Sequence, residues 1–160
     1  MNAITLLDAQ HDEVSALFEK FEGASTAQQK QNLYEKIADS LAAHATIEEK
    51  IFYPAVKAAR TEDILLESVE EHLGIKRIIA DLLGMSPADT NYDAKMKVLK
   101  EEVEHHVGEE RSKLFPEARK LLIADALEAL GKQMEAMFVE LMARAPRLSV
   151  PKETAKAAAV

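Results

Sequence analysis

Two stretches decide the fold, HATIEEKIFYP at residues 44–54 and HVGEERSKLFP at residues 106–116. Each begins with a histidine, carries a glutamate four residues later, and ends with an aromatic residue followed by proline. Residues four apart on an α-helix share one face and lie about 6 Å apart along the axis. Each histidine–glutamate pair therefore points to one side of a helix, and the repetition predicts a chain of two similar halves.

Apolar residues recur at steps of three and four around both pairs and along most of the chain, as in helices that bury one face. The pattern predicts four long helices, at about residues 4–21, 26–59, 62–82 and 92–114. Ser25 or Thr26 can cap the second helix and Thr61 the third. Because a mid-helix proline bends the axis, we expect kinks at Pro54 and Pro116, with a site one to three turns before them.

Composition points to an all-α protein and narrows its partners. Glycine and proline number five each, cysteine is absent, and the formal net charge is −8. This charge repels phosphate backbones and anionic lipids, so we expect neither a nucleic acid nor a membrane partner. The sequence shows no membrane span or secretory leader, which makes the cytoplasm the expected location. Any metal would be held by nitrogen and oxygen.

The chain is expected to divide into three parts. Residues 1–122 form the bundle, and residues 123–145 form an additional C-terminal amphipathic helix. That helix could cover the bundle or pair with a second copy in a homodimer. Residues 146–160 are expected to be a solvated, flexible tail.

Six polar residues interrupt the predicted apolar seams at matched places. Each predicted helix contributes one histidine to this set. His11 and His44 are 33 residues apart, and His72 and His106 are 34 residues apart. Buried without partners, six such groups would cost several kcal/mol, each forfeiting about 1–3 kcal/mol, and a bound cation removes that cost. The predicted metal ligands are His11, His44, Glu48, His72, His106 and Glu110.

The ligand set predicts two metal ions. Six ligands exceed the four of a closed zinc site, and two carboxylates can bridge ions about 3.5–4 Å apart. Imidazole with carboxylate suits iron, with manganese and zinc as the alternatives. We expect two irons bridged by Glu48 and Glu110 and by an oxo or hydroxo group, with a position open on each for a small molecule.

Simpler interpretations exist for each of these residues. A single histidine in a helical seam, such as His11, is more often a hydrogen-bonded core residue than a ligand. His105 also precedes a glutamate by four residues, but its helical neighbours are charged, so this pair is expected on the surface. Glu49 and Glu109 are expected to be surface groups or to contact the ligands. The matched placement of all six favours a metal site.

These motifs resemble the hemerythrin-like, or HHE cation-binding, family over about residues 1–120. The resemblance implies an up-down-up-down four-helix bundle. Oxygen-carrying members hold a second histidine one turn after the third-helix ligand, where this chain has Lys76, and an aspartate five residues after the fourth-helix histidine, where it has Arg111. Losing one imidazole should open a coordination position, which disfavours reversible oxygen carriage.

The leading functional hypothesis is a non-haem di-iron protein that binds and reacts with dioxygen, peroxide or nitric oxide, including catalase-like decomposition of peroxide. The sequence shows no separate nucleophile or general base. One alternative is an oxygen or redox sensor, or an iron-binding protein without turnover. A second alternative is a metal-free structural bundle.

Overall fold

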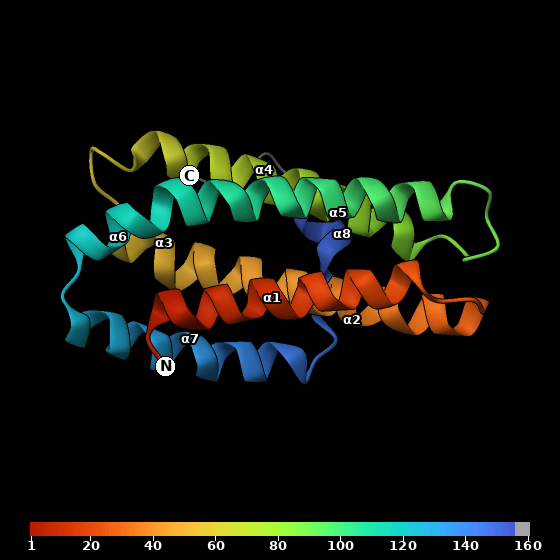
Figure 1. Cartoon of the computed structure of the whole chain (residues 1–160), viewed down its shortest axis with the longest axis horizontal. Coiled ribbons are helices and arrows are strands. Elements are labelled where there is room, and N and C mark those ends of the chain that lie inside the picture. Colours follow the sequence, from red (N-terminus) through yellow and green to blue (C-terminus); the bar gives the residue numbers. More distant parts are fainter. Residues whose placement is uncertain (156–160) are drawn as a thin grey trace.

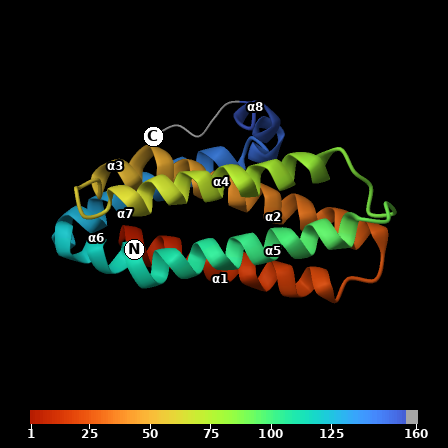
Figure 2. The same cartoon turned by 90° about the horizontal axis from the view of Figure 1, so that it is seen from above.

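The computed structural model describes residues 1–155 and folds them into a four-helix bundle with a further helix on one side (Figure 1). Loops alternate between the two ends of the bundle, so neighbouring helices run in opposite directions (Figures 1 and 2). The expected all-α bundle with an additional helix is confirmed. Its long helices are α1 (Ala3–Glu22), α2 (Ala27–Ile47), α4 (Glu62–Leu83), α5 (Tyr92–Glu109) and α7 (Ala124–Met142).

The two prolines are accommodated by π-helical turns. Helix α2 continues through η1 (Glu48–Phe52) into the short α3 (Tyr53–Ala55), and α5 continues through η2 (Glu110–Leu114) into α6 (Phe115–Leu121). The amide of Tyr53 donates to Glu48 O, and that of Phe115 donates to Glu110 O. Proline has no N–H and clashes with the carbonyl four residues before it, and a π-turn relieves both problems. Each turn begins at the glutamate of its motif, closer to the site than expected.

Side-chain caps fix two of the expected helix starts. Asn2 Oδ1 accepts from the Thr5 amide at 2.9 Å, and Thr26 forms a reciprocal capping box with Gln29. The expectation for Thr61 is wrong, because its side chain makes no capping bond to α4. Its hydroxyl donates instead to Val56 O at 2.7 Å, which fixes the loop between α3 and α4.

The apolar core forms two clusters. One lies toward the α1–α2 loop and includes Phe18, Ile79 and Leu99, whereas the other lies toward the opposite end and includes Leu7, Phe52 and Leu114. On each of the four bundle helices, the seam histidine falls between members of these two clusters. The buried polar site is thus enclosed along the bundle axis by hydrophobic side chains.

Helix α7 packs on the bundle itself, against α1 and α2, with Leu127 and Met134 buried (Figure 1). A Cβ atom at Gly131 would lie 2.2 Å from the carbonyl oxygen of Met1. Only glycine therefore permits this close approach between α7 and the start of the chain. Pairing with a second copy through α7 remains a prediction.

The chain after α7 returns to the bundle through η3 (Pro146–Ser149) and α8 (Val150–Glu153). Val150 is fully buried in the first apolar cluster, and Arg147 Nη1 donates to Asp39 Oδ2 at 2.7 Å. The expectation of a solvated tail is wrong for this segment, because an apolar side chain and an ion pair attach it to α2 and α4. The rest of that tail, residues 156–160, lies outside the described residues. The division at residues 122 and 145 remains a prediction.

Candidate metal centre

The structure brings all six predicted ligand side chains together inside the bundle. His11 comes from α1, His44 from α2, His72 from α4 and His106 from α5, while Glu48 and Glu110 begin the two π-turns. None is more than 7 % exposed, and both glutamates are fully buried. Their role as ligands remains a prediction.

A first group of ligand atoms comes from His11, His44, Glu48 and Glu110, all within 4.8 Å of one another. His11 Nε2 lies 3.2 Å from His44 Nε2, and His44 Nε2 lies 3.0 Å from Glu48 Oε1. Two ligands about 2.1 Å from one ion, at angles between 90° and 109°, are about 3.0–3.4 Å apart. The spacing in this group matches that of ligands sharing one ion.

A second group comes from Glu48, His72 and His106. His72 Nε2 lies 3.0 Å from His106 Nε2 and 3.0 Å from Glu48 Oε2. Glu48 therefore belongs to both groups and presents Oε1 to the first and Oε2 to the second. One carboxylate between two ligand groups is the arrangement of a bridging ligand.

Glu110 also approaches histidines of both groups. Its Oε1 atom is 2.7 Å from His106 Nε2 in the second group and 3.6 Å from His11 Nε2 in the first. Within residues 1–155, neither Glu110 oxygen nor Glu48 Oε1 has a hydrogen-bond partner under standard geometry. Buried carboxylate oxygens without such partners are costly, and a cation between the two groups would satisfy them.

The donor set fits a pair of transition-metal ions. Four imidazole nitrogens and two carboxylates suit iron, manganese or zinc, whereas calcium and magnesium prefer oxygen ligands alone. These six residues would hold the ions, with Glu48 between them.

Three of the four histidines are oriented from behind by a hydrogen bond at Nδ1. His44 Nδ1 lies 2.7 Å from Gln10 Oε1, His72 Nδ1 lies 3.1 Å from Glu49 Oε2, and His106 Nδ1 lies 2.9 Å from Glu71 Oε1. Amide and carboxylate oxygens only accept, so each Nδ1 carries the proton and Nε2 is left to face the site. Such contacts fix the ring and raise its basicity as a ligand.

His11 differs from the other three histidines. Its Nδ1 atom is buried without a hydrogen-bond partner among the described residues and lies 3.8 Å from Asp8 Oδ1. Arg111 engages Asp8 and also donates to Asp12 Oδ1 at 2.8 Å. The residue at the position of the carriers' aspartate thus points outward and pairs with α1, so Glu110 is the carboxylate that α5 and its extension bring to the site.

Tyr53 is a further polar group at the site. Its hydroxyl donates to Glu48 Oε2 at 3.1 Å and lies 3.3 Å from His72 Nε2. Burial, followed by the charges of Glu110 and Glu48, holds the pKa of Tyr53 well above its usual value. The phenol therefore keeps its proton and serves as a hydrogen-bond donor beside the ligands.

The buried histidines and carboxylates shift one another's protonation. Burial alone would raise the pKa of Glu48, but the charge of His44 and close contacts with His106, His44 and His72 hold that pKa well below its usual range. Burial would lower the pKa of His106, but Glu110, Glu48 and Glu71 raise it well above its usual value. Without metal, the site thus favours an ionised Glu48 beside a protonated His106.

Lys76 lies one turn after His72 and is only 9 % exposed. Its ammonium group is 3.3 Å from Glu49 Oε2 and 3.4 Å from Glu153 Oε2 on α8. In place of a further imidazole, the chain thus has a cation that pairs with the carboxylate behind His72 and with the C-terminal segment.

Most of the neighbouring residues lie where the sequence predicts. The His105 side chain is 64 % exposed, as expected, and Glu109 pairs with Lys113 on the surface. Glu49 contacts His72, one of its two expected roles. Gln10 was missed, because an amide beside a ligand histidine gives no pattern of its own. The hydroxyl of Tyr53 could have been suspected from the Tyr-Pro pair.

A small cavity of about 30 Å³ adjoins the four histidines and Lys76. The rest of its lining is mainly aliphatic and includes Val14, Ile75 and Val103. A volume of about 10–15 Å³ admits one water molecule. The cavity therefore has room for a molecule of one or two heavy atoms beside the Nε2 atoms.

Comparisons with known proteins agree with this picture. The family model described as the hemerythrin HHE cation binding domain matches residues 2–118. The chain is 23 % identical to a hemerythrin HHE cation binding domain-containing protein from Mycobacterium kansasii whose crystal structure is known, with a TM-score of 0.80 over 96 % of this chain and 94 % of that one. This second likeness shows the fold.

Two further proteins are similar to this chain in sequence. An uncharacterized protein of Mycobacterium tuberculosis is 27 % identical over 143 residues, which are 88 % of each chain. A protein of Nostoc sp. named DNA nickase is 26 % identical over 144 residues, which cover 90 % of this chain and 41 % of that protein.

Within residues 1–155, no helix is long and apolar enough to cross a bilayer. Since the family model spans the bundle, the chain belongs to the hemerythrin HHE cation-binding domain family, which implies a metal-binding site with histidine and glutamate ligands.

Proposed function

We propose that this chain is a non-haem di-iron protein that binds and reacts with a small oxidant, either dioxygen, peroxide or nitric oxide. The observation that carries the proposal is the position of Glu48, whose two oxygens face two different histidine pairs at 3.0 Å. One carboxylate shared in this way, together with a second carboxylate whose oxygens lack hydrogen bonds, supports two ions instead of one.

Iron ions held there would supply electrons to, or accept them from, a bound oxidant. The protein residues would restrict what reaches that place. The two apolar clusters exclude bulk water, and the cavity of about 30 Å³ admits only a small molecule next to the histidines. The Tyr53 hydroxyl, 3.1 Å from Glu48, can donate a hydrogen bond at the edge of the site.

Catalase-like turnover would convert two molecules of hydrogen peroxide into two of water and one of dioxygen. This reaction needs no other reductant, and it suits a site where the described residues offer no separate nucleophile. A sensor or iron-binding protein would use the same site without turnover. The chain's net charge of −8 gives no support for action on DNA, so the name of the Nostoc relative is not carried over.

The test is reconstitution with ferrous iron under anaerobic conditions, followed by metal analysis, absorption spectroscopy and measurement of dioxygen evolved from peroxide. Wild-type protein should hold two irons per chain, and its spectrum should change on exposure to peroxide. His106→Ala should lose most of the iron and the reaction. The matched control is Glu101→Ala, because this α5 residue is exposed and is not in either ligand group.

Each outcome distinguishes one hypothesis. Dioxygen evolution supports the enzyme, and a reversible spectral change without turnover supports the sensor. Protein that never holds stoichiometric iron, and whose thermal stability is unchanged by chelators, would contradict the proposal and leave a structural bundle.

A further inference from the structure

Helices α2 and α4 belong to different hairpins of the bundle and meet along one face. Helix α2 packs mainly on α1, and α4 packs mainly on α5. The last described part of the chain lies over the join between α2 and α4, because η3 packs on both helices and α8 packs on α4 (Figures 1 and 2). We call residues 146–153 the C-terminal strap.

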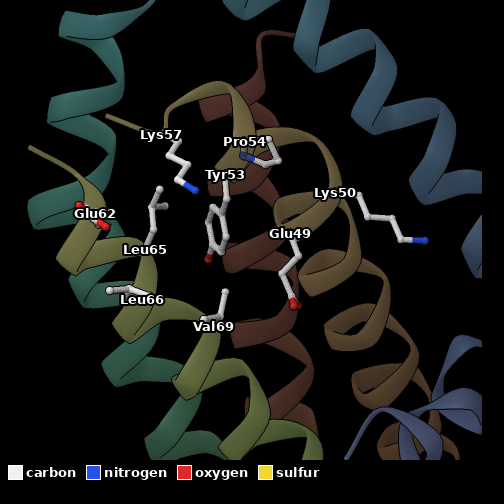
Figure 3. Close-up of a pocket in the computed structure, with 9 residues that line it drawn as sticks. All are labelled: Glu49, Lys50, Tyr53, Pro54, Lys57, Glu62, Leu65, Leu66 and Val69. Atoms are coloured by element: carbon white, nitrogen blue, oxygen red, sulfur yellow. The ribbon is translucent and has the colours of Figure 1, made fainter. Parts of the chain in front are cut away.

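The part of this face that the strap leaves free is hollow. A surface pocket of about 510 Å³ lies there, between the α2 extension and the first turns of α4 (Figure 3). Among residues 1–155, its lining includes Tyr53 and no residue of the strap. The Tyr53 ring stacks on His72 with centroids 5.6 Å apart, and its hydroxyl binds Glu48. A fixed aromatic ring thus separates this pocket from the candidate metal centre.

Lys76 lies under the strap and spans the same face. Its Nζ atom is 3.3 Å from Glu49 Oε2 on the α2 extension and 3.4 Å from Glu153 Oε2 at the end of α8. Lys76 also lines the cavity of about 30 Å³ that adjoins the four predicted ligand histidines. Detaching the strap would therefore remove the outer partner of a side chain that borders this cavity.

The strap is fastened to the bundle at three points. At its start, the amide and Nη1 of Arg147 donate to the Asp39 carboxylate at 3.0 and 2.7 Å. In its middle, Val150 is fully buried, and at its end Glu153 forms the ion pair with the lysine. Leu148, on the same segment, is 59 % exposed. One apolar side chain and two ion pairs thus hold the strap in place.

The residue that joins the strap to the chain before it is strained. Ala145 has φ 49° and ψ 69°, in the left-handed region, and it is the one residue other than glycine with positive φ within residues 1–155. A side chain with a Cβ atom disfavours this conformation. Detachment relieves the strain, and a short segment with few buried side chains separates at a lower free energy than a bundle helix.

We propose that the strap is a lid over the candidate metal centre, and that its detachment lets water and small solutes reach Lys76 and the cavity. Val150 shares an apolar cluster with Leu41, Ile75 and Ile79, which also line that cavity. Withdrawing Val150 therefore uncovers the cavity wall. Control of oxidant access rests on the proposed function, whereas the movement of the strap requires no metal.

The first test uses metal-free protein. Val150→Asp should hold the strap open, because a carboxylate is costly to bury among apolar side chains. Acetylation of Lys76 by an N-hydroxysuccinimide ester, followed by mass spectrometry, should then be about tenfold faster than in wild-type protein. Lys132, exposed on α7, is the internal reference. Leu148→Asp is the matched control, because it introduces the same charge on the exposed side of the strap.

Hydrogen exchange distinguishes a lid from a part of the core. In the wild-type structure the amides of Arg147 and Thr154 donate to Asp39 Oδ1 and to Val150 O. Both amides should exchange faster in Val150→Asp, while the amides of α2 and α4 keep their wild-type protection.

The second test uses ferrous-iron-loaded protein. At equal iron content, Val150→Asp should react with hydrogen peroxide about threefold faster than wild-type protein, because access no longer waits for the strap. Leu148→Asp should react at the wild-type rate. Stopped-flow absorption measures both rates.

Failure of the lid and failure of the proposed function give different results. Faster acetylation of Lys76 in a protein that never holds iron would support the lid and contradict only the proposed function. Three results would overturn the lid: unchanged acetylation of Lys76 in Val150→Asp, faster exchange throughout α2 and α4, or an unchanged peroxide rate in iron-loaded protein whose Lys76 is accessible.

Discussion

His44 and His106 occupy matching places in the two halves of the bundle, but different groups lie behind them. The Nδ1 atom of His44 contacts the neutral amide of Gln10, whereas that of His106 contacts the carboxylate of Glu71. The contrast recurs in the other pair, because His72 has Glu49 behind it and His11 has no hydrogen-bond partner at Nδ1 among the described residues. A carboxylate behind an imidazole makes it a stronger ligand.

The aromatic residues before the two prolines differ as well. In the first half this residue is Tyr53, whose hydroxyl donates to Glu48. In the second half it is Phe115, whose ring stacks on His11 with centroids 5.9 Å apart and offers no hydrogen bond to Glu110. Matched ligand motifs can therefore hold two ions in unequal surroundings. We expect the His72–His106 ion to be the more tightly bound.

The largest expected effect is that of Glu48→Gln, which removes the charge shared by both groups. The variant should retain well below one metal ion per chain under a chelator challenge that leaves wild-type protein with two. Metal analysis after dialysis measures this. Glu109→Gln is the control, because Glu109 pairs with Lys113 on the surface. Two ions retained by Glu48→Gln would show that this residue does not join the groups.

The next largest effect concerns the groups behind the histidines. Wild-type protein should bind two ions in two resolvable steps, and Glu71→Gln should weaken the tighter step by about 10–100-fold while keeping an acceptor for His106. Gln10→Glu should instead tighten the weaker step. Competition titration with a chromophoric chelator measures both. If Glu71→Gln weakened only the weaker step, the assignment of the tighter ion to the His72–His106 pair would be wrong.

A smaller effect is expected for Tyr53→Phe. Removing the hydroxyl takes one hydrogen bond, worth about 1 kcal/mol, from Glu48, so metal affinity should fall about fivefold. Tyr34→Phe provides the comparison, because the Tyr34 hydroxyl donates to Ile79 O at 2.8 Å, away from the ligands. Both variants should lose similar stability in urea, and only Tyr53→Phe should lose metal affinity. An equal effect on metal binding would mean that packing, and not the contact with Glu48, is responsible.

The smallest effect is expected for Lys76→Met. Without the ammonium group, the charge of Glu49 acts on His72 alone, which favours the more oxidised metal and should lower the reduction potential. Metal affinity should change less than about threefold. A redox titration measures the shift, and Lys76→Arg should restore the wild-type potential. A rise in potential on losing the lysine would contradict this electrostatic account.

Much of the site could be predicted because its ligands obey helical spacing. His44 with Glu48, and His106 with Glu110, stand one turn apart in apolar seams, so their meeting follows from amphipathic packing. Gln10 carries no such signal, since its contact with His44 depends on how α1 and α2 pack. The sequence therefore shows which ligand residues share a helix face, but it does not show which groups contact the far side of each histidine ring.

Backbone features, too, could be predicted only in part from the sequence. Pro54 and Pro116 indicate a disturbed helix, but whether it kinks or forms a π-turn depends on the packing around it. Thr61 satisfies the composition of a helix cap yet bonds to the loop before it. Val150 lies in a segment with few apolar residues, so its burial against the bundle could be seen only in the fold.

The most direct test is a crystal structure of ferrous-iron-loaded protein with anomalous diffraction at the iron edge. The account predicts two iron peaks inside the bundle, one at His11 and His44 and the other at His72 and His106, with the Glu48 carboxylate between them. A single peak, or iron bound only at surface carboxylates with the six side chains free of metal, would contradict it.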